Sequence, residues 1–472
     1  MDFLSSVFTW LGEREAGISA VVGIAVLAGI VFAGVRSLLR RRAEPAPEKA
    51  RAGVEATSAT DSSLPGLDPL TVPGFEGRPA IAVLPFDNLS GDPEQDYFAD
   101  GIAEDLITRL SAWRYVPVIA RNSSFTYKGK PVDVKQVSRE LGVRYVVEGS
   151  VRKAAERVRI SAQLIDATTG AHVWAETYDR EVQDIFALQD EITEAIVGSL
   201  QPELVLSEGE RAARKEPQNL GAWELAQRGW WHFNRLTKED NRKALSFIER
   251  AIELDPNFVW AYYALAWAHY SDIFFSWTDN AAQSIAEIIQ AAGKAVSLDD
   301  KDPFAQIALG MGYSLTGQRD KTIAAGELAA QLGPSSSYAH HFFGTILAMT
   351  GRPEEGLASI KKAMRLSPRD PWMWDFLAAV AIAHFAAGRY EEAVEWARRS
   401  LQRKPDYIWP LDTLAASLAH LGRVDEARCA VEESLRSTPD HSISTLRLVF
   451  GTADVDLLER LFDGLRQAGL PE

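Results

Sequence analysis

Between residues 317 and 439 the chain repeats one spacing of glycine and proline four times. In each case a glycine precedes a proline by 17 residues, at Gly317/Pro334, Gly351/Pro368, Gly388/Pro405 and Gly422/Pro439. Successive glycines are 34, 37 and 34 residues apart. Glycine permits a tight turn between two helices, and proline cannot continue the helix that precedes it. The spacing therefore predicts a series of antiparallel helix pairs.

A period of 34 residues with two helices per unit resembles the tetratricopeptide repeat. Small residues recur at two equivalent places on the second helices, where the helices of a pair must approach closely. The first set is Ala244, Thr322, Gly356, Ala393 and Ala427, and the second is Ala251, Ala295, Ala329, Ala363, Ser400 and Ser434. We predict about six repeats over 219–439, the first two irregular. A capping helix within 440–472 is expected to cover the last apolar face.

The resemblance implies a concave face built by the first helix of each pair, the usual place for peptide binding in this family. By the family's register, the candidate partner-binding residues are Met311, Tyr338, His341, Asp375, Trp409 and Asp412. Each of them could equally pack in the core or face solvent. The many tryptophans of this region are more often core than contact surface, so they identify no partner.

Residues 80–206 have the pattern of an α/β domain, and 207–218 would connect it to the repeats. The predicted elements are a strand at 81–86, a helix at about 95–112, a strand at 116–120, a helix at 132–141, strands at 144–152, 158–166 and 172–178, and a helix at about 182–206. Alternating apolar and polar residues in the later strands indicate a sheet with one covered face. The order βαβαβββα predicts a mixed sheet.

Residues 80–178 resemble the TolB amino-terminal-like domain, which often accompanies tetratricopeptide repeats in bacterial signalling proteins. The matching segments are IAVLPFDNLSGDPEQDYFADGIAEDLITRLS, VIARNSSFTYKG, ELGVRYVVEGSVRK and VRISAQLIDATTGAHVWAETYDR. In the family this module occurs fused to class III adenylate cyclase domains, winged-helix regulators and kinases. Here an apolar amino-terminal segment stands in place of such a domain, which leaves the chain without the family's usual chemistry.

The loop after the first strand is acidic and could in principle gather a hard cation on oxygen ligands. Its acidic residues are Asp87, Asp92, Glu94, Asp96 and Asp100. Their spacing does not match a calcium loop, and such residues also serve turns and helix starts, which is the favoured interpretation. Residues 121–124 and 148–150 could line the same sheet edge, although turn and hairpin roles are favoured for them too. We therefore predict no metal site and no cofactor.

Residues 17–35 form a run of 19 residues without a charge. A helix of this length spans roughly 28 Å, about the thickness of the hydrocarbon core of a bilayer. A cleaved signal peptide is the alternative, but its basic residues would precede the apolar run. Ala25, Gly29 and Ala33 share one face of this helix and could support a homodimer, although small residues are common in such helices in any case.

Four arginines follow the apolar run closely, at 36, 40, 41 and 42, whereas Arg14 alone precedes it. This asymmetry predicts a single-pass protein of the bacterial inner membrane with a cytoplasmic body, the periplasm being the alternative. Residues 1–16 would be a short outer segment. Residues 36–79, basic at first and then rich in proline and serine, would form a flexible linker.

Charge and composition exclude several functions. The net charge is −15, and residues 1–42 contribute +2, so the remaining 430 residues carry −17 and are a poor partner for nucleic acid. With Cys429 as the only cysteine, an internal disulfide and a cysteine-based zinc site are excluded. No phosphate-binding glycine loop, kinase signature or nucleophile elbow is present in the sequence.

The sequence thus predicts a membrane-anchored scaffold without enzymatic activity, which binds protein partners through its repeats. The alternative is a sensor or regulatory subunit, whose α/β domain binds a small ligand and signals to a separate cyclase, kinase or transcription factor.

Overall fold

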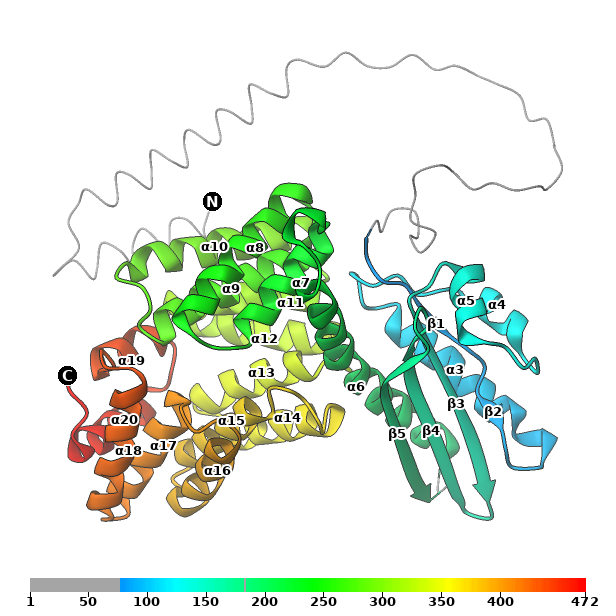
Figure 1. Cartoon of the computed structure of the whole chain (residues 1–472). Coiled ribbons are helices and arrows are strands. Elements are labelled where there is room, and N and C mark those ends of the chain that lie inside the picture. Colours follow the sequence, from blue (N-terminus) through cyan, green and yellow to red (C-terminus); the bar gives the residue numbers. More distant parts are fainter. Residues whose placement is uncertain (1–76, 182–183) are drawn as a thin grey trace. The chain divides into compact units, whose positions relative to one another are not determined.

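The computed structural model of the chain describes residues 77–181 and 184–472 (Figure 1). The predicted membrane span at 17–35, the preceding segment and the linker up to residue 76 lie outside these residues. None of the helices described is long and apolar enough to cross a membrane.

The first described part is an α/β domain. Its elements are β1 (Ile81–Val83), β2 (Asp87–Asn88), α3 (Asp96–Leu110), α4 (Arg121–Ser124), α5 (Val134–Leu141), β3 (Tyr145–Ala154), β4 (Arg157–Asp166), β5 (Ala171–Glu181) and α6 (Ile185–Ala213). The sheet order is β1-β3-β4-β5, and β2 pairs with β3 beyond the end of β1. Because β1 and β2 run parallel to β3 while β3, β4 and β5 are antiparallel, the predicted mixed sheet is confirmed.

One predicted strand is not a strand. Residues 116–120 make a single bridge, between Val118 and Ile81, with two flanking backbone hydrogen bonds. Pro117 has no backbone N–H to donate, which stops the ladder on its amino side, and α4 begins at Arg121 on the other side. The segment therefore only borders the sheet.

Helices cover both faces of the sheet. The Tyr145 hydroxyl on β3 contacts Ser207 and Glu208 of α6. The next residue, Val146, packs with Val137 of α5 in an apolar cluster. Since successive residues of a strand point to opposite faces, α6 and α5 lie on opposite sides of the sheet.

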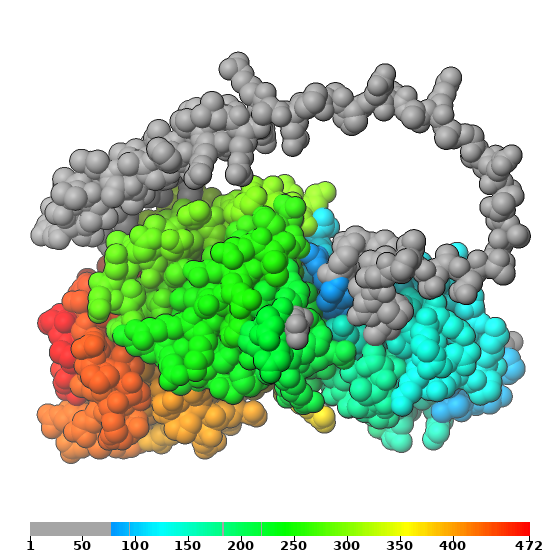
Figure 2. Space-filling view, turned by 45° about the horizontal axis from the view of Figure 1, so that its top comes forward, coloured from blue at the N-terminus to red at the C-terminus, as the bar shows by residue number. Residues whose placement is uncertain are grey.

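The second part consists of six antiparallel helix pairs. They are α7 (Ala222–Phe233) with α8 (Lys238–Leu254), α9 (Val259–Phe274) with α10 (Ala281–Leu298), α11 (Pro303–Leu315) with α12 (Arg319–Leu332), α13 (Ser337–Met349) with α14 (Pro353–Leu366), α15 (Met373–Ala386) with α16 (Tyr390–Arg403), and α17 (Ile408–His420) with α18 (Val424–Ser437). In the space-filling view the green helices from the start of the array and the orange to red ones from its end lie against each other (Figure 2). The predicted all-helical repeat array is confirmed.

The four glycines of the repeat spacing have the role expected of them. Gly317, Gly351, Gly388 and Gly422 all have positive φ, between 73° and 91°, in the turn within a pair. The small residues predicted to lie between helices are also buried, ten of the eleven with no exposed surface and Gly356 in the buried class. The sequence pattern therefore reports both the turn and the close approach of the two helices.

The carboxyl-terminal region contains two helices where one capping helix is predicted within 440–472. The longer, α20 (Val455–Ala468), packs against α17 and α18 as a cap should. The shorter, α19 (Ile443–Val449), instead contacts α9 and α11 near the start of the array. The chain thus crosses the inner side of the repeats before it forms the cap.

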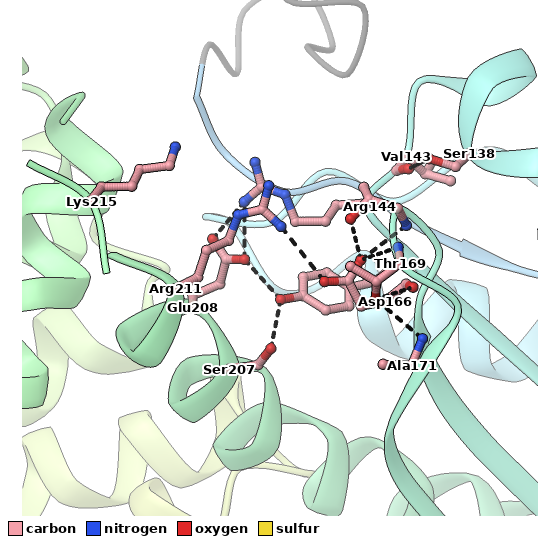
Figure 3. Close-up of polar contacts among 12 residues, drawn as sticks. Ser138, Val143, Arg144, Asp166, Thr169, Ala171, Ser207, Glu208, Arg211 and Lys215 are labelled. Carbon is pink, nitrogen blue, oxygen red and sulfur yellow. Dashed lines mark hydrogen bonds and ion pairs between the residues drawn. The ribbon is translucent and has the colours of Figure 1, made fainter. Parts of the chain in front are cut away.

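Helix α6 joins the two parts, which belong to one compact unit. It continues to Ala213, beyond the end predicted near Leu206, so that more than half of the expected connector 207–218 is helical. The reason is Glu208, whose buried carboxylate accepts hydrogen bonds from Arg144, Tyr145 and Trp223. Figure 3 shows Glu208 beside Arg144. The three partners of Glu208 come from β3 and its amino-terminal edge and from α7, so the end of α6 is fixed from both sides.

Candidate functional site

The inner face of the repeats is rich in aromatic side chains. On α9, Tyr263, Trp267 and Tyr270 follow each other at intervals of four and three residues, which places them on one side of the helix. Trp230 of α7, in the preceding repeat, and Trp372, at the start of α15 three repeats later, meet this side. The ring centroids of Trp230 and Trp372 are 6.1 Å apart, and those of Trp267 and Trp372 are 6.2 Å apart. Such contacts stabilise the array beyond the area that they bury.

These aromatic residues surround a cavity of about 90 Å³. Four of the predicted partner-binding residues line it: Met311, Tyr338, His341 and Asp375. They come from three successive first helices, α11, α13 and α15. The family register therefore brings these four residues to one place, while their role in binding a partner stays a prediction.

The other two predicted residues lie elsewhere. Trp409 lines a neighbouring cavity of about 60 Å³, to which Asp375 also contributes. Asp412 reaches neither cavity, because it is buried in a contact with His441, whose Nε2 is 2.9 Å from Asp412 Oδ2. Asp412 therefore holds the carboxyl-terminal region in place instead of facing a groove.

The carboxyl-terminal segment supplies wall residues that the sequence did not reveal. Val449, Phe450, Thr452 and Ala453 line the larger cavity, and Phe450 lines the smaller one as well. The Arg319 guanidinium donates to the carbonyls of Thr452 and Ala453 at 2.9 and 2.5 Å. The apolar residues between Pro439 and the capping helix were the available signal, but a pattern of seven residues does not indicate where a helix docks.

Asp375 and His341 both line the larger cavity, and burial shifts the pKa of each toward its uncharged form. Burial raises the pKa of Asp375, whose Oδ1 accepts a 2.7 Å hydrogen bond from the Tyr407 hydroxyl. Burial lowers the pKa of His341, whose ring stacks on Phe376 with the centroids 4.5 Å apart. His341 Nε2 is 3.5 Å from Asp375 Oδ2 and makes no hydrogen bond.

The α/β domain has a larger and more polar hollow of about 990 Å³ on the face of the sheet that α5 covers only in part. Glu148, Gly149 and Ser150 line it, together with Asp87 of the acidic loop. Residues 121–124 do not line it. The structure thus brings residues 148–150 together with Asp87 of the acidic loop.

The acidic loop is held by internal hydrogen bonds. Asn88 Nδ2 donates to Asp96 Oδ1 at 2.7 Å, Gln95 Nε2 donates to Asp92 Oδ2 at 3.2 Å, and Asp100 pairs with Lys128. Across residues 77–181 and 184–472, no three His, Cys, Asp or Glu side chains are grouped as metal ligands would be. The hydrogen bonds support the turn role of the loop, whereas α3 begins at Asp96 without a side-chain cap.

Solved structures resemble each part at low identity. A tetratricopeptide protein of Thermus thermophilus, TTC0263, is 17% identical with a TM-score of 0.34, over 42% of this chain and 99% of its own. TolB from Acinetobacter baumannii is 19% identical with a TM-score of 0.19, over 26% of this chain and 28% of its own.

A sequence relative covers more of the chain. Over 245 residues the chain is 45% identical to a Rhizobium meliloti (strain 1021) protein named "Putative adenylate cyclase 3". That match spans 51% of this chain but only 41% of the relative.

Two family models match the chain. Residues 77–195 match the HilA/YgeH-like transcriptional regulator second domain, and residues 344–408 match the tetratricopeptide repeat. The chain therefore combines an α/β domain like the second domain of HilA/YgeH-like regulators with an array of tetratricopeptide repeats.

Proposed function

We propose that this chain is a non-enzymatic adaptor that binds a protein partner on the inner face of its repeats. The observation that carries this proposal is the cavity between the first helices, with its aromatic walls and a buried carboxylate. Aromatic residues and methionine are enriched where proteins bind each other, and half-buried rings offer large contact area at low entropic cost. The similarity to tetratricopeptide proteins supports the same function.

A site-specific photo-crosslinker tests this function. The half-buried Tyr338 is replaced by a benzophenone amino acid in the full chain, and the exposed Lys361 on the outer helix α14 is replaced in a matched control. We expect a discrete partner adduct after irradiation in cells from position 338 and none from position 361. Adducts from position 361 alone, or none from either, would contradict a partner on the inner face.

The chain would act at the bacterial inner membrane, anchored by residues 17–35 with its body in the cytoplasm. The support is the uncharged run of 19 residues followed by four arginines. The chain should stay in the membrane fraction after an alkaline carbonate wash and lose this property when residues 17–35 are deleted. Alkaline phosphatase fused to the carboxyl terminus should be inactive, whereas strong activity would place the body in the periplasm.

A sensor function is the alternative, and the polar hollow of the α/β domain favours it. Its floor includes Glu148, Ser161, Gln163 and Thr177, which bond to each other in pairs across the strands and could bind a polar small molecule instead. The partner would then be a signalling protein, and the relative named as an adenylate cyclase suggests that class. A ligand that raises the thermal midpoint of the wild type, but not that of Gln163→Leu, would establish this function.

A further inference from the structure

The cavity on the inner face has an unusual combination of walls. Five of its aromatic residues are Trp230, Tyr263, Trp267, Tyr270 and Trp372. Within residues 77–181 and 184–472, Asp375 is the one carboxylate that lines it, and no lysine or arginine does. The nearby Arg319 guanidinium donates hydrogen bonds to the carbonyls of Thr452 and Ala453. The electron-rich rings and Asp375 therefore face no cation in the described part of the chain, and a cation bound beside Asp375 would favour its carboxylate form against the effect of burial.

Aromatic faces attract positive charge. The ring quadrupole makes each face electron-rich, and the attraction grows when the cation leaves water. Trp230 and Trp372 are stacked within 21° of parallel, with Trp267 tilted against Trp372. Trp267, Tyr270 and Trp372 are only half-buried, so the cavity borders on solvent and an incoming side chain can reach it. An enclosed apolar core would have buried these rings completely.

The cavity also has hydrogen-bond acceptors that are not fully used. His341 Nε2 and Thr345 Oγ1 are buried and make no hydrogen bond, and Asp375 Oδ2 lies 3.5 Å from His341 Nε2. Burial lowers the pKa of His341, which keeps Nε2 available as an acceptor when the proton is on Nδ1. Unpaired buried acceptors cost free energy, so they favour an occupant that donates to them.

We propose, on the basis of the adaptor function above, that this cavity binds the ammonium group of a lysine side chain of the partner. Three acceptors, Asp375, His341 and Thr345, match the three N–H donors of an ammonium group. A quaternary amine has no donors, and a guanidinium has five in a planar fork that this small space does not match. The lysine stem would lie against the rings, as such stems do on apolar surfaces. The indole N–H of Trp267, which makes no hydrogen bond, would remain available for a carbonyl of the same segment.

Binding of side-chain analogues to the full chain tests this inference. The chain is purified in n-dodecyl maltoside with ¹⁵N-labelled tryptophan indoles, and the Trp267 signal is assigned with Trp267→Phe. Butylammonium chloride represents the lysine head and stem, 1-butanol the uncharged stem, and tetramethylammonium chloride a cation without donors. We expect a saturable shift of the Trp267 signal with butylammonium. The other two probes should bind more weakly by a factor of about ten or more, since they lack the charge-assisted hydrogen bonds.

Two variants locate the site. Asp375→Asn keeps the size of the side chain and should weaken butylammonium binding by about tenfold, in line with loss of the charge. Asp302→Asn is the matched control, because Asp302 is a buried helix cap outside this cavity and asparagine caps equally well. Thr345→Val, which removes one acceptor at nearly constant volume, provides the same test should Asp375→Asn fold poorly.

Several outcomes would overturn the inference. Equal affinity for 1-butanol would show a merely apolar cavity, and equal affinity for tetramethylammonium would show a site for quaternary amines. Unchanged binding in Asp375→Asn and Thr345→Val, or no saturable shift with any probe, would also overturn it. The adaptor function fails separately, because it depends on the Tyr338 adduct. An adduct from position 338 without ammonium binding would support the adaptor function and refute the lysine-binding site.

Discussion

At the residue scale, the contact around Glu208 shows how much one buried charge can organise. Glu208 is 2% exposed, and Arg144, its counter-charge, is 6% exposed. Its two oxygens accept hydrogen bonds from the Arg144 guanidinium, the Tyr145 hydroxyl and the Trp223 indole at 2.7 to 3.0 Å. A buried ion pair adds little net stability when complete, but leaving one partner alone is costly.

We expect Glu208→Gln to lower the free energy of unfolding by about 3 kcal/mol, because Arg144 stays buried without its carboxylate. Urea unfolding followed by tryptophan fluorescence measures this loss. The exposed pair Glu239–Lys243 is the control, since Glu239→Gln should cost no more than about 0.5 kcal/mol. Equal effects of the two substitutions would mean that the Glu208 contact is not structural.

The contact between His441 and Asp412 gives the carboxyl-terminal region a dependence on pH. Burial lowers the pKa of His441, but the Asp412 carboxylate outweighs this effect and raises it above the ordinary value. A raised folded-state pKa contributes stability that is fully present below the unfolded value of about 6.5 and is lost as pH rises through the folded value. We therefore expect this contact to stabilise the chain more at pH 6 than at pH 9.

The measurement is the difference in thermal midpoint between wild type and His441→Gln at several pH values. The comparison is needed because burial lowers the pKa of other histidines, including His341 and His269, and these act in the opposite direction. The difference should shrink as pH rises. A difference that stays constant would refute the proposed charge on His441.

At the element scale, the repeats could be predicted well from the sequence and the carboxyl-terminal crossing poorly. Glycine at positive φ and small residues at the helix contact are local requirements, so the sequence shows both as regularly spaced residues. Helix α19 docks on α9 and α11, more than 120 residues earlier in the chain, and no local pattern records such a contact. The same limit explains the candidate site. The register assigned Met311, Tyr338, His341 and Asp375 to one face, but the wall from Val449 to Ala453 depends on tertiary packing.

Two helical glycines provide a matched test of how closely the helices of a pair approach. A Cβ at Gly356 of α14 would lie 2.6 Å from the Gly344 carbonyl and 2.7 Å from the Ala348 nitrogen, both on α13. A Cβ at Gly293 of α10 would meet nothing within 4 Å. We expect Gly356→Ala to destabilise the chain by about 2 kcal/mol through overpacking, whereas Gly293→Ala should stabilise it by about 0.5 kcal/mol. Urea midpoints measure both, and equal effects would contradict the close approach.

At the scale of the whole described unit, α6 couples the sheet to the repeats along its length. A Cβ at Gly198 would lie 2.6 Å from the Leu366 carbonyl at the end of α14, and Ser199 Oγ donates to the same carbonyl at 3.2 Å. Glu194 pairs with Lys362 at 2.7 Å on the same side. Helix α6 therefore packs on the middle of the array as well as on its first helix.

This packing predicts cooperative unfolding of the two parts. Differential scanning calorimetry should show one transition for the wild type, because the α/β domain cannot leave the array without breaking the α6–α14 contact. Gly198→Val should separate the transition into two, since the larger side chain displaces α14. Gly221→Ala, at a glycine where an added Cβ would meet nothing within 4 Å, should leave a single transition. Two transitions in the wild type would show that the parts unfold independently.

The crossing of the carboxyl-terminal segment has a mechanical consequence. An array of stacked helix pairs can extend along its superhelix axis when each pair contacts only its neighbours. Here Arg319 of the third pair binds the Thr452 and Ala453 carbonyls, and the Met349 carbonyl of the fourth pair accepts from the Asp454 backbone N–H at 2.7 Å. Residues 452–454 therefore link the third and fourth pairs on the inner side of the superhelix. A pulling force must break these hydrogen bonds before the superhelical pitch can change.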